Sequence, residues 1–141
     1  MEIKVKKLHP DAKLPTKGTE GSAYYDVYAL EDTRVYASYT RAVRTGVSLE
    51  CPTGYVVDIR PRSSLSMKGL SIANSPGTLD SDYRGELLIL VMQYRGFSFM
   101  IRKGNRIAQI GLLKVEPIEF KEVDELSETR RGSSGIGSTG R

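Results

Sequence analysis

Short stretches in which apolar and polar residues alternate recur along the chain, and each is bounded by Gly, Pro, Asn or Asp. Alternation with a period of two is typical of β-strands that bury one face. The pattern predicts strands over residues 3–8, 24–30, 45–49, 54–59, 86–93, 98–101 and 106–115. The first of these carries basic residues between its apolar ones, and we expect it at a sheet edge or swapped onto a neighbour. Many short strands at close spacing indicate a sandwich or a barrel.

One segment, residues 63–68, has the features of a short helical turn. Ser63 or Ser64 is expected to cap its start, and Gly69 is expected to end it. Residues 129–141 are rich in glycine and serine and have almost nothing to bury. We therefore predict an all-β domain over residues 1–128, followed by a flexible glycine-rich C-terminal arm over residues 129–141.

The composition limits the classes of function open to the chain. A formal net charge of +4 is spread over small basic groups, too few for a face that binds nucleic acid. Charge alone leaves open a small phosphorylated ligand or a solvated basic surface. Cys51 and His9 are the only residues of their types, which excludes an intrachain disulfide and a zinc cluster. It also argues against catalysis by a Cys–His pair or a Ser–His–Asp triad.

The region that begins at Met1 is charged and has no apolar signal segment, and no apolar run reaches the length of a membrane span. We therefore expect no membrane partner and a cytoplasmic location, in the cytoplasm of the host cell if the source is viral.

Residues 77–86 form the first block that is suited to chemistry. A glycine-bounded turn places Asp80, Asp82 and Tyr83 just before an apolar strand. A partly desolvated carboxylate there can take a proton from water, and Asp80 is the first candidate because the apolar Leu79 beside it can anchor it in a pocket. The alternative is that both aspartates only cap a hairpin.

Two further blocks are suited to binding phosphate. Arg62 precedes Ser63 and Ser64 at the start of the helical turn, and Arg131 opens the glycine-rich arm. Guanidinium groups, hydroxyls and free backbone amides together bind anions. An ordinary helix start and a disordered tail remain alternatives. With no histidine or cysteine site, the blocks indicate attack of water on a phosphoryl group, with a hard cation bound mainly by the substrate.

Read in order, five blocks resemble the five motifs of the homotrimeric dUTPases: residues 21–27, 61–65, 77–86, 104–109 and 131–140. The resemblance implies a jelly-roll-like β-barrel or sandwich, the dUTPase-like fold. It implies Mg²⁺-assisted hydrolysis of dUTP to dUMP and pyrophosphate, which keeps uracil out of DNA and supplies dUMP for dTMP synthesis. It also implies a homotrimer whose active sites lie between subunits.

The same resemblance implies a role for each matching residue. Asp80 is the general base for a water that attacks the α-phosphorus, and Asp26 holds Mg²⁺ through water. The residues implied for the phosphates are Arg62, Ser63, Ser64, Gln109, Arg131, Ser138 and Thr139. Those implied for uracil and deoxyribose are Asn74, Gly77, Leu79, Tyr83 and Ile136.

The chain departs from the family pattern at several positions. Ile136 stands where an aromatic ring usually stacks on uracil, and Tyr24 replaces a small residue in the first motif. Two alternatives stay open at this point. One is a dCTP deaminase-like enzyme, although residues 87–92 lack the acidic residue that its chemistry needs. The other is a regulatory protein on the same fold that uses nucleotide occupancy to control a protein partner.

Overall fold

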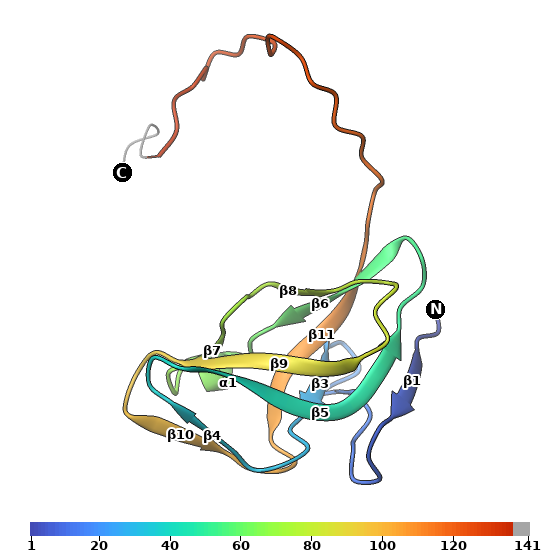
Figure 1. Ribbon diagram of the computed structural model, residues 1–141, viewed down its shortest axis with the longest axis vertical. Helices are drawn as coiled ribbons and strands as arrows, with labels where there is room; N and C mark the ends of the chain where they lie inside the picture. Colours follow the sequence, from blue (N-terminus) through green and yellow to red (C-terminus); the bar gives the residue numbers. More distant parts are fainter. Residues whose placement is uncertain (137–141) are drawn as a thin grey trace.

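The computed structural model describes residues 1–136, and its regular secondary structure consists of antiparallel strands and one short helical turn (Figure 1). The elements in chain order are β1 (Lys4–Lys7), β2 (Thr16–Lys17), β3 (Tyr25–Tyr28), β4 (Thr33–Tyr36), β5 (Thr40–Glu50), β6 (Tyr55–Arg60), α1 (Ser63–Ser66), β7 (Leu70–Ile72), β8 (Gly77–Leu79), β9 (Glu86–Gln93), β10 (Ser98–Ile101) and β11 (Arg106–Lys114).

The strands form two large sheets and one small sheet. The order is β1-β5-β9-β7 in the four-stranded sheet and β2-β3-β11-β6-β8 in the five-stranded sheet, while β4 and β10 pair by themselves. Apolar side chains from both large sheets join in one core, with Val43 and Ile89 from one sheet and Val57 and Ile110 from the other. The molecule is therefore a sandwich, as the alternation predicted.

Strand β9 shows how the alternating pattern sets the burial. Leu87, Ile89 and Val91 are buried in the core, whereas Leu88 between them is exposed. The observed bounds of β9 and β10 are the predicted ones, and β1 lies at the edge of its sheet as predicted. Alternation of apolar and polar residues with a period of two depends only on local sequence, so these strands could be predicted from it.

Four short strands, β2, β4, β7 and β8, were not predicted, and β5 begins earlier than predicted. Each of the four has two to four residues, too few for a period to be recognised. Three of them pair with a longer strand: β2 pairs with β3, β7 with β9, and β8 with β6. Strand β4 pairs with β10, which is equally short.

The helical turn is present but begins differently from the prediction. The N-cap is Arg62 in an extended conformation, with no side-chain cap hydrogen bond, so the predicted cap by Ser63 or Ser64 is wrong. The backbone carbonyl of Arg62 accepts hydrogen bonds from the amides of Leu65 and Ser66, both at 3.0 Å. Both serines lie inside the turn, so their hydroxyls are not used for capping. Gly69, with φ +86°, ends the turn as predicted.

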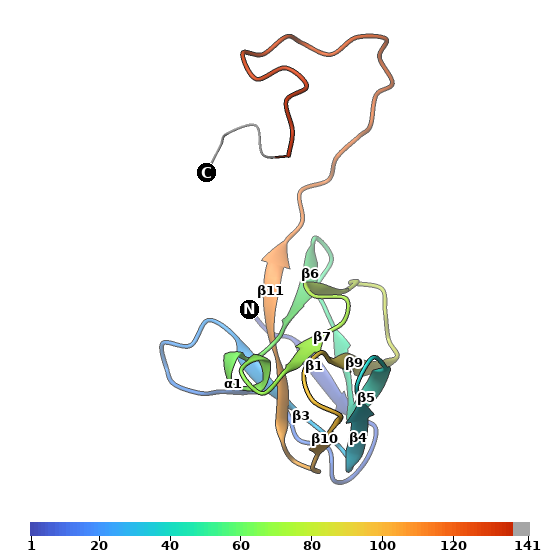
Figure 2. The same ribbon diagram turned by 90° about the vertical axis from the view of Figure 1, so that its left-hand side faces the viewer.

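Residues 115–136 leave β11 and run away from the body of the molecule in both views (Figures 1 and 2). They contain no strand or helix in the described structure. Ile118, Phe120 and Ile136 are fully or almost fully exposed along this segment. Among residues 1–136, no helix has the length and apolar character needed to cross a membrane.

Candidate active site

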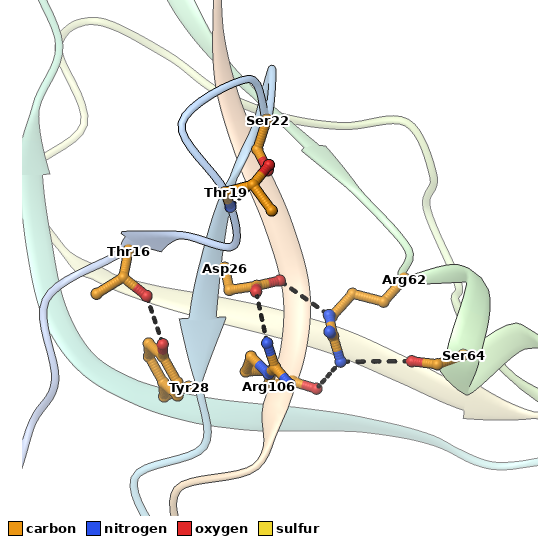
Figure 3. Close-up of polar contacts among 8 residues, drawn as sticks. All are labelled: Thr16, Thr19, Ser22, Asp26, Tyr28, Arg62, Ser64 and Arg106. Atoms are coloured by element: carbon orange, nitrogen blue, oxygen red, sulfur yellow. Dashed lines mark hydrogen bonds and ion pairs between the residues drawn. The ribbon is translucent and has the colours of Figure 1, made fainter.

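The carboxylate of Asp26 on β3 is buried and held by two guanidinium groups. Nε of Arg62 donates to its Oδ1 at 2.8 Å, and Nη1 of Arg106 lies 3.4 Å from its Oδ2 (Figure 3). The Asp26 side chain is only 5% exposed. A buried carboxylate is costly unless it is paired and hydrogen-bonded, and these two arginines meet that requirement.

Arg62 links this carboxylate to the start of α1. Its Nη1 lies 3.4 Å from Oγ of Ser64 and 3.4 Å from the backbone carbonyl oxygen of Arg106 (Figure 3). Ser63 and Ser64 are both exposed at this end of the turn. The first and second sequence blocks therefore meet, and they place the Ser64 hydroxyl beside an oriented guanidinium.

Gln109 on β11 lies between the first and second blocks. It is directly opposite Asp26 on β3 and directly opposite Arg60 on β6. Opposite residues in antiparallel strands point to the same face of a sheet. Ile110, the next residue, is buried in the core, so Gln109 and its row lie on the outer face of the five-stranded sheet.

A separate pocket of about 240 Å³ opens beside β8 and β9. Its lining residues include Asn74, Leu79, Asp80 and Tyr83. Asn74 lies in the connection between β7 and β8, strands that belong to different sheets. The third block is therefore brought together with Asn74, and the connection that carries Asn74 is not a simple β-hairpin.

Two glycines shape this pocket. Gly77 is buried, and a Cβ there would lie 3.3 Å from Cβ of Ile59 and 3.5 Å from Nδ2 of Asn74. A Cβ on Gly85 would lie 2.3 Å from the hydroxyl oxygen of Tyr83, so the tyrosine lies directly over this glycine. The Tyr83 hydroxyl donates to the backbone carbonyl of Glu86 at 3.1 Å.

Tyr83 is 43% exposed, so it is a pocket residue and not a core residue. Asp80 follows β8 directly and is exposed, while Leu79 before it is 7% exposed and anchors the backbone in the core. The carboxylate of Asp80 therefore stands where it is free to meet a ligand in the pocket.

The structure thus divides the predicted residues into two groups. Asp26, Arg62, Ser63, Ser64 and Gln109 form one group, and none of them lines the pocket that contains Asp80. Arg131 lies in the segment that leaves the body, where its Nε donates to the carbonyl of Ser134 at 2.9 Å. Ile136 is exposed in the same segment, and Ser138 and Thr139 lie outside the described residues.

The described residues offer few side chains that could bind a metal ion directly. In residues 1–136 there is no group of three or more His, Cys, Asp or Glu side chains able to hold a metal ion. Asp26 is already paired with two arginines.

Sequence reasoning missed a polar cluster beside Gln109. The Tyr24 hydroxyl donates to Oδ2 of Asp58 at 2.7 Å, and Nε of Arg60 donates to the same oxygen at 2.6 Å. The hydrogen bond to Asp58 raises the pKa of the Tyr24 phenol, and burial adds to the effect. The available signal was the polar alternation in β6, where Asp58 and Arg60 interrupt an apolar run.

A family model for dUTPase matches residues 10–140. The chain belongs to the dUTPase family. The deoxyuridine 5'-triphosphate nucleotidohydrolase of Nautilia profundicola is 42% identical to it over 142 residues, which cover 100% of both chains. The protein of the same name from a Hydrogenobaculum species is 43% identical over 142 residues and covers 99% of each chain.

Solved structures of dUTPases share the fold. The dUTPase of Staphylococcus bacteriophage 80alpha, solved with dUPNHPP, superposes with a TM-score of 0.88 at 28% identity, covering 99% of both chains. The dUTPase of phage phi11 superposes with a TM-score of 0.80 at 22% identity, covering 91% of this chain and 100% of the phage chain. The predicted jelly-roll-like dUTPase fold is therefore confirmed.

Proposed function

We propose that this chain hydrolyses dUTP to dUMP and pyrophosphate. The observation that carries the proposal is the position of Asp80 in a pocket whose lining also includes Asn74 and Tyr83. A carboxylate there can orient a water and take its proton as it attacks the α-phosphorus in line with the leaving pyrophosphate. The reaction keeps uracil out of DNA and supplies dUMP for dTMP synthesis.

The pocket supports recognition of uracil and deoxyribose. The side-chain amide of Asn74 can donate hydrogen bonds through its NH₂ group and accept them through its oxygen, so it can pair with the edge of the base. Gly77 lets the backbone and Asn74 approach closely, and Leu79 provides an apolar wall. Tyr83 lies against the deoxyribose and leaves no room for a 2′-hydroxyl, and Ile136 covers the base from the arm.

The outer face of the five-stranded sheet supports binding of the phosphates. Arg62 is fixed by Asp26, and Ser63, Ser64 and Gln109 present polar groups beside it. Positive charge and fixed donors stabilise the charge that develops as pyrophosphate leaves. In this proposal the residues that come from the arm are Arg131, Ser138 and Thr139.

Mg²⁺ is the expected cofactor, and the phi11 dUTPase structure is described as showing coordination of a structural Mg(II) ion. When bound to the triphosphate it would neutralise phosphate charge, and Asp26 would hold its water shell.

A homotrimer in which each active site is built by more than one subunit explains why the predicted residues form two separate groups in one chain. The pocket and the phosphate-binding face are formed by separate groups of residues in a single chain. The segment that carries Arg131 runs away from the body of the molecule (Figures 1 and 2). Joining the pocket of one subunit to the phosphate-binding face of the next, with residues 129–141 as a closing arm, completes the site. We place this trimer in the cytoplasm, with dUTP as its ligand.

Release of pyrophosphate in the presence of Mg²⁺ tests the proposal, with dUTP compared against dCTP, dTTP and UTP. We expect turnover of dUTP and little of the other three. Deamination of dCTP is not supported, because β9 carries no acidic residue from Leu87 to Met92. A chain that releases no pyrophosphate from dUTP under these conditions does not have the proposed function.

A further inference from the structure

The outer face of the five-stranded sheet carries a row of polar residues that extends beyond the predicted site. Asp26, Gln109 and Arg60 are opposite one another across β3, β11 and β6. The next row contains Gly111 on β11, which is opposite Asp58 on β6. Arg60 is thus the cross-strand neighbour of Gln109, on the side away from Asp26.

Tyr24 and Gly111 create a contact across the middle strand. A Cβ on Gly111 would lie 2.8 Å from Cε1 of Tyr24, so the tyrosine ring lies directly on the backbone of β11. This close approach lets the Tyr24 hydroxyl reach Asp58 on β6 at 2.7 Å. Tyr24 therefore requires a glycine on β11.

The Tyr24–Asp58 pair fixes the side chain of Arg60. Nε of Arg60 donates to Asp58 at 2.6 Å, and its guanidinium carbon lies 5.1 Å from the centroid of the Tyr24 ring. The Asp58 side chain is 6% exposed, whereas that of Arg60 is 53% exposed. Asp58 holds the Nε of this guanidinium and the Tyr24 ring covers one of its faces, whereas the terminal nitrogens remain accessible.

Arg62 is held through its Nε in the same way. Its Nε also donates to a buried carboxylate, that of Asp26, at 2.8 Å. In both cases the carboxylate orients the fork, and the terminal nitrogens lie beyond the Nε contact. Arg60, Arg62 and Arg106 contribute three positive charges against the two negative charges of Asp26 and Asp58, so this group has a net charge of +1.

We propose that Arg60 is a further binding residue for the phosphate chain of the nucleotide, and that Tyr24 and Asp58 are positioning residues that fix its guanidinium. The inference rests on the proposed function, because it extends the same phosphate-binding face. Arg60 adds a second oriented guanidinium next to Gln109, and such a fork matches the geometry of phosphate oxygens.

The test compares a ligand that has only the phosphate chain with one that has only the base and sugar. Inorganic triphosphate and deoxyuridine are measured as competitive inhibitors of dUTP hydrolysis, and triphosphate binding is also measured by calorimetry. Arg60→Ala is expected to weaken triphosphate binding about tenfold, the size of a charge-assisted hydrogen bond, and to leave deoxyuridine within about twofold.

Arg34→Ala is the matched control, because it removes the same charge from β4 in the small sheet. Tyr24→Phe keeps the ring over Gly111 and removes only the hydroxyl, so triphosphate binding is expected to fall about threefold. Arg60→Lys keeps the charge and is expected to bind triphosphate more tightly than Arg60→Ala. Circular dichroism of each variant checks that the fold is kept.

Equal triphosphate affinity in Arg60→Ala and Arg34→Ala would overturn the inference. An equal loss for triphosphate and deoxyuridine would also overturn it, since that is the effect of a structural change. Absence of dUTP hydrolysis in the wild-type chain contradicts the proposed function instead, and the calorimetric comparison with triphosphate still decides the role of Arg60.

Discussion

At the scale of single residues, Asp80 is the proposed general base, so we expect its replacement to separate chemistry from binding. Asp80→Asn keeps the size of the side chain and removes its ability to accept a proton at neutral pH. We expect kcat for dUTP to fall about 10³-fold, within the range for a general base, while the non-hydrolysable dUpNHpp still binds. Pyrophosphate release and calorimetry measure the two effects.

Asp82→Asn is the control for Asp80→Asn, since Asp82 is exposed in the same turn and does not line the pocket. It is expected to keep wild-type turnover. Unchanged kcat in Asp80→Asn would remove Asp80 from the role of general base.

Because of Tyr24, the free energy of unfolding is expected to depend on pH in the alkaline range. Its pKa is raised in the folded chain because its hydroxyl donates to Asp58, so the folded state holds this proton more tightly than the unfolded state. The resulting stability is fully present below pH about 10, the ordinary tyrosine pKa, and is lost as pH rises through the raised value. Tyr24→Phe lacks this contribution.

Urea unfolding of the wild-type chain and Tyr24→Phe between pH 8 and 11 measures this effect. The difference in the free energy of unfolding is expected to be constant up to pH about 10 and to narrow above it. The other tyrosines are present in both proteins, so the comparison isolates Tyr24. A difference that stays constant to pH 11 would show that Tyr24 does not hold its proton in this way.

At the scale of elements, the outer face of β3, β11 and β6 depends on the fit between Tyr24 and Gly111. Gly111→Ala places a Cβ 2.8 Å from the Tyr24 ring and is expected to lower the free energy of unfolding by about 1–3 kcal/mol. Gly111→Ala combined with Tyr24→Ala removes the clash, so its cost is expected to be much smaller than the sum of the single changes. Denaturant unfolding of the four proteins gives this cycle, and additive costs would contradict the contact.

The C-terminal segment carries the departure at Ile136. An isoleucine covers a base by apolar contact alone, whereas an aromatic ring also stacks on it. Ile136→Phe is therefore expected to lower KM for dUTP about five- to tenfold, the lower part of the range for base–aromatic stacking. Ile118→Phe, at an exposed position earlier in the segment, is the control. An unchanged KM in Ile136→Phe would mean that this residue does not cover the base.

At the scale of the whole molecule, the separation of the pocket from the phosphate-binding face gives a direct test of shared sites. Asp80→Asn and Arg62→Ala are each expected to inactivate a different half of a site. If each site joins halves from two subunits, random trimers refolded from an equal mixture have both intact halves in about one quarter of their sites.

Refolding the two variants together is therefore expected to restore about one quarter of wild-type dUTP turnover, measured as pyrophosphate release. Refolding each variant alone provides the baseline. No gain over this baseline, in a mixture that light scattering shows to be trimeric, would place each site within one subunit.

The sequence by itself determined the fold class and the blocks to which the proposed chemistry is assigned. Burial alternates with a period of two within β9, and this pattern needs no knowledge of partners. Asp80 after Leu79, and Arg62 before Ser63, are likewise local arrangements. Their roles were assigned from the family resemblance. That resemblance can be recognised from the sequence because the motifs are short and follow one another in a fixed order.

The tertiary structure alone decided which of these residues meet. The register of β3, β11 and β6 places Asp26, Gln109 and Arg60 in one row, although 83 residues separate Asp26 from Gln109 along the chain. The contact of Tyr24 with Gly111, and through it the position of Arg60, depends on distances across strands. Local sequence does not contain such distances, because they are set by pairing between segments that are far apart in the chain.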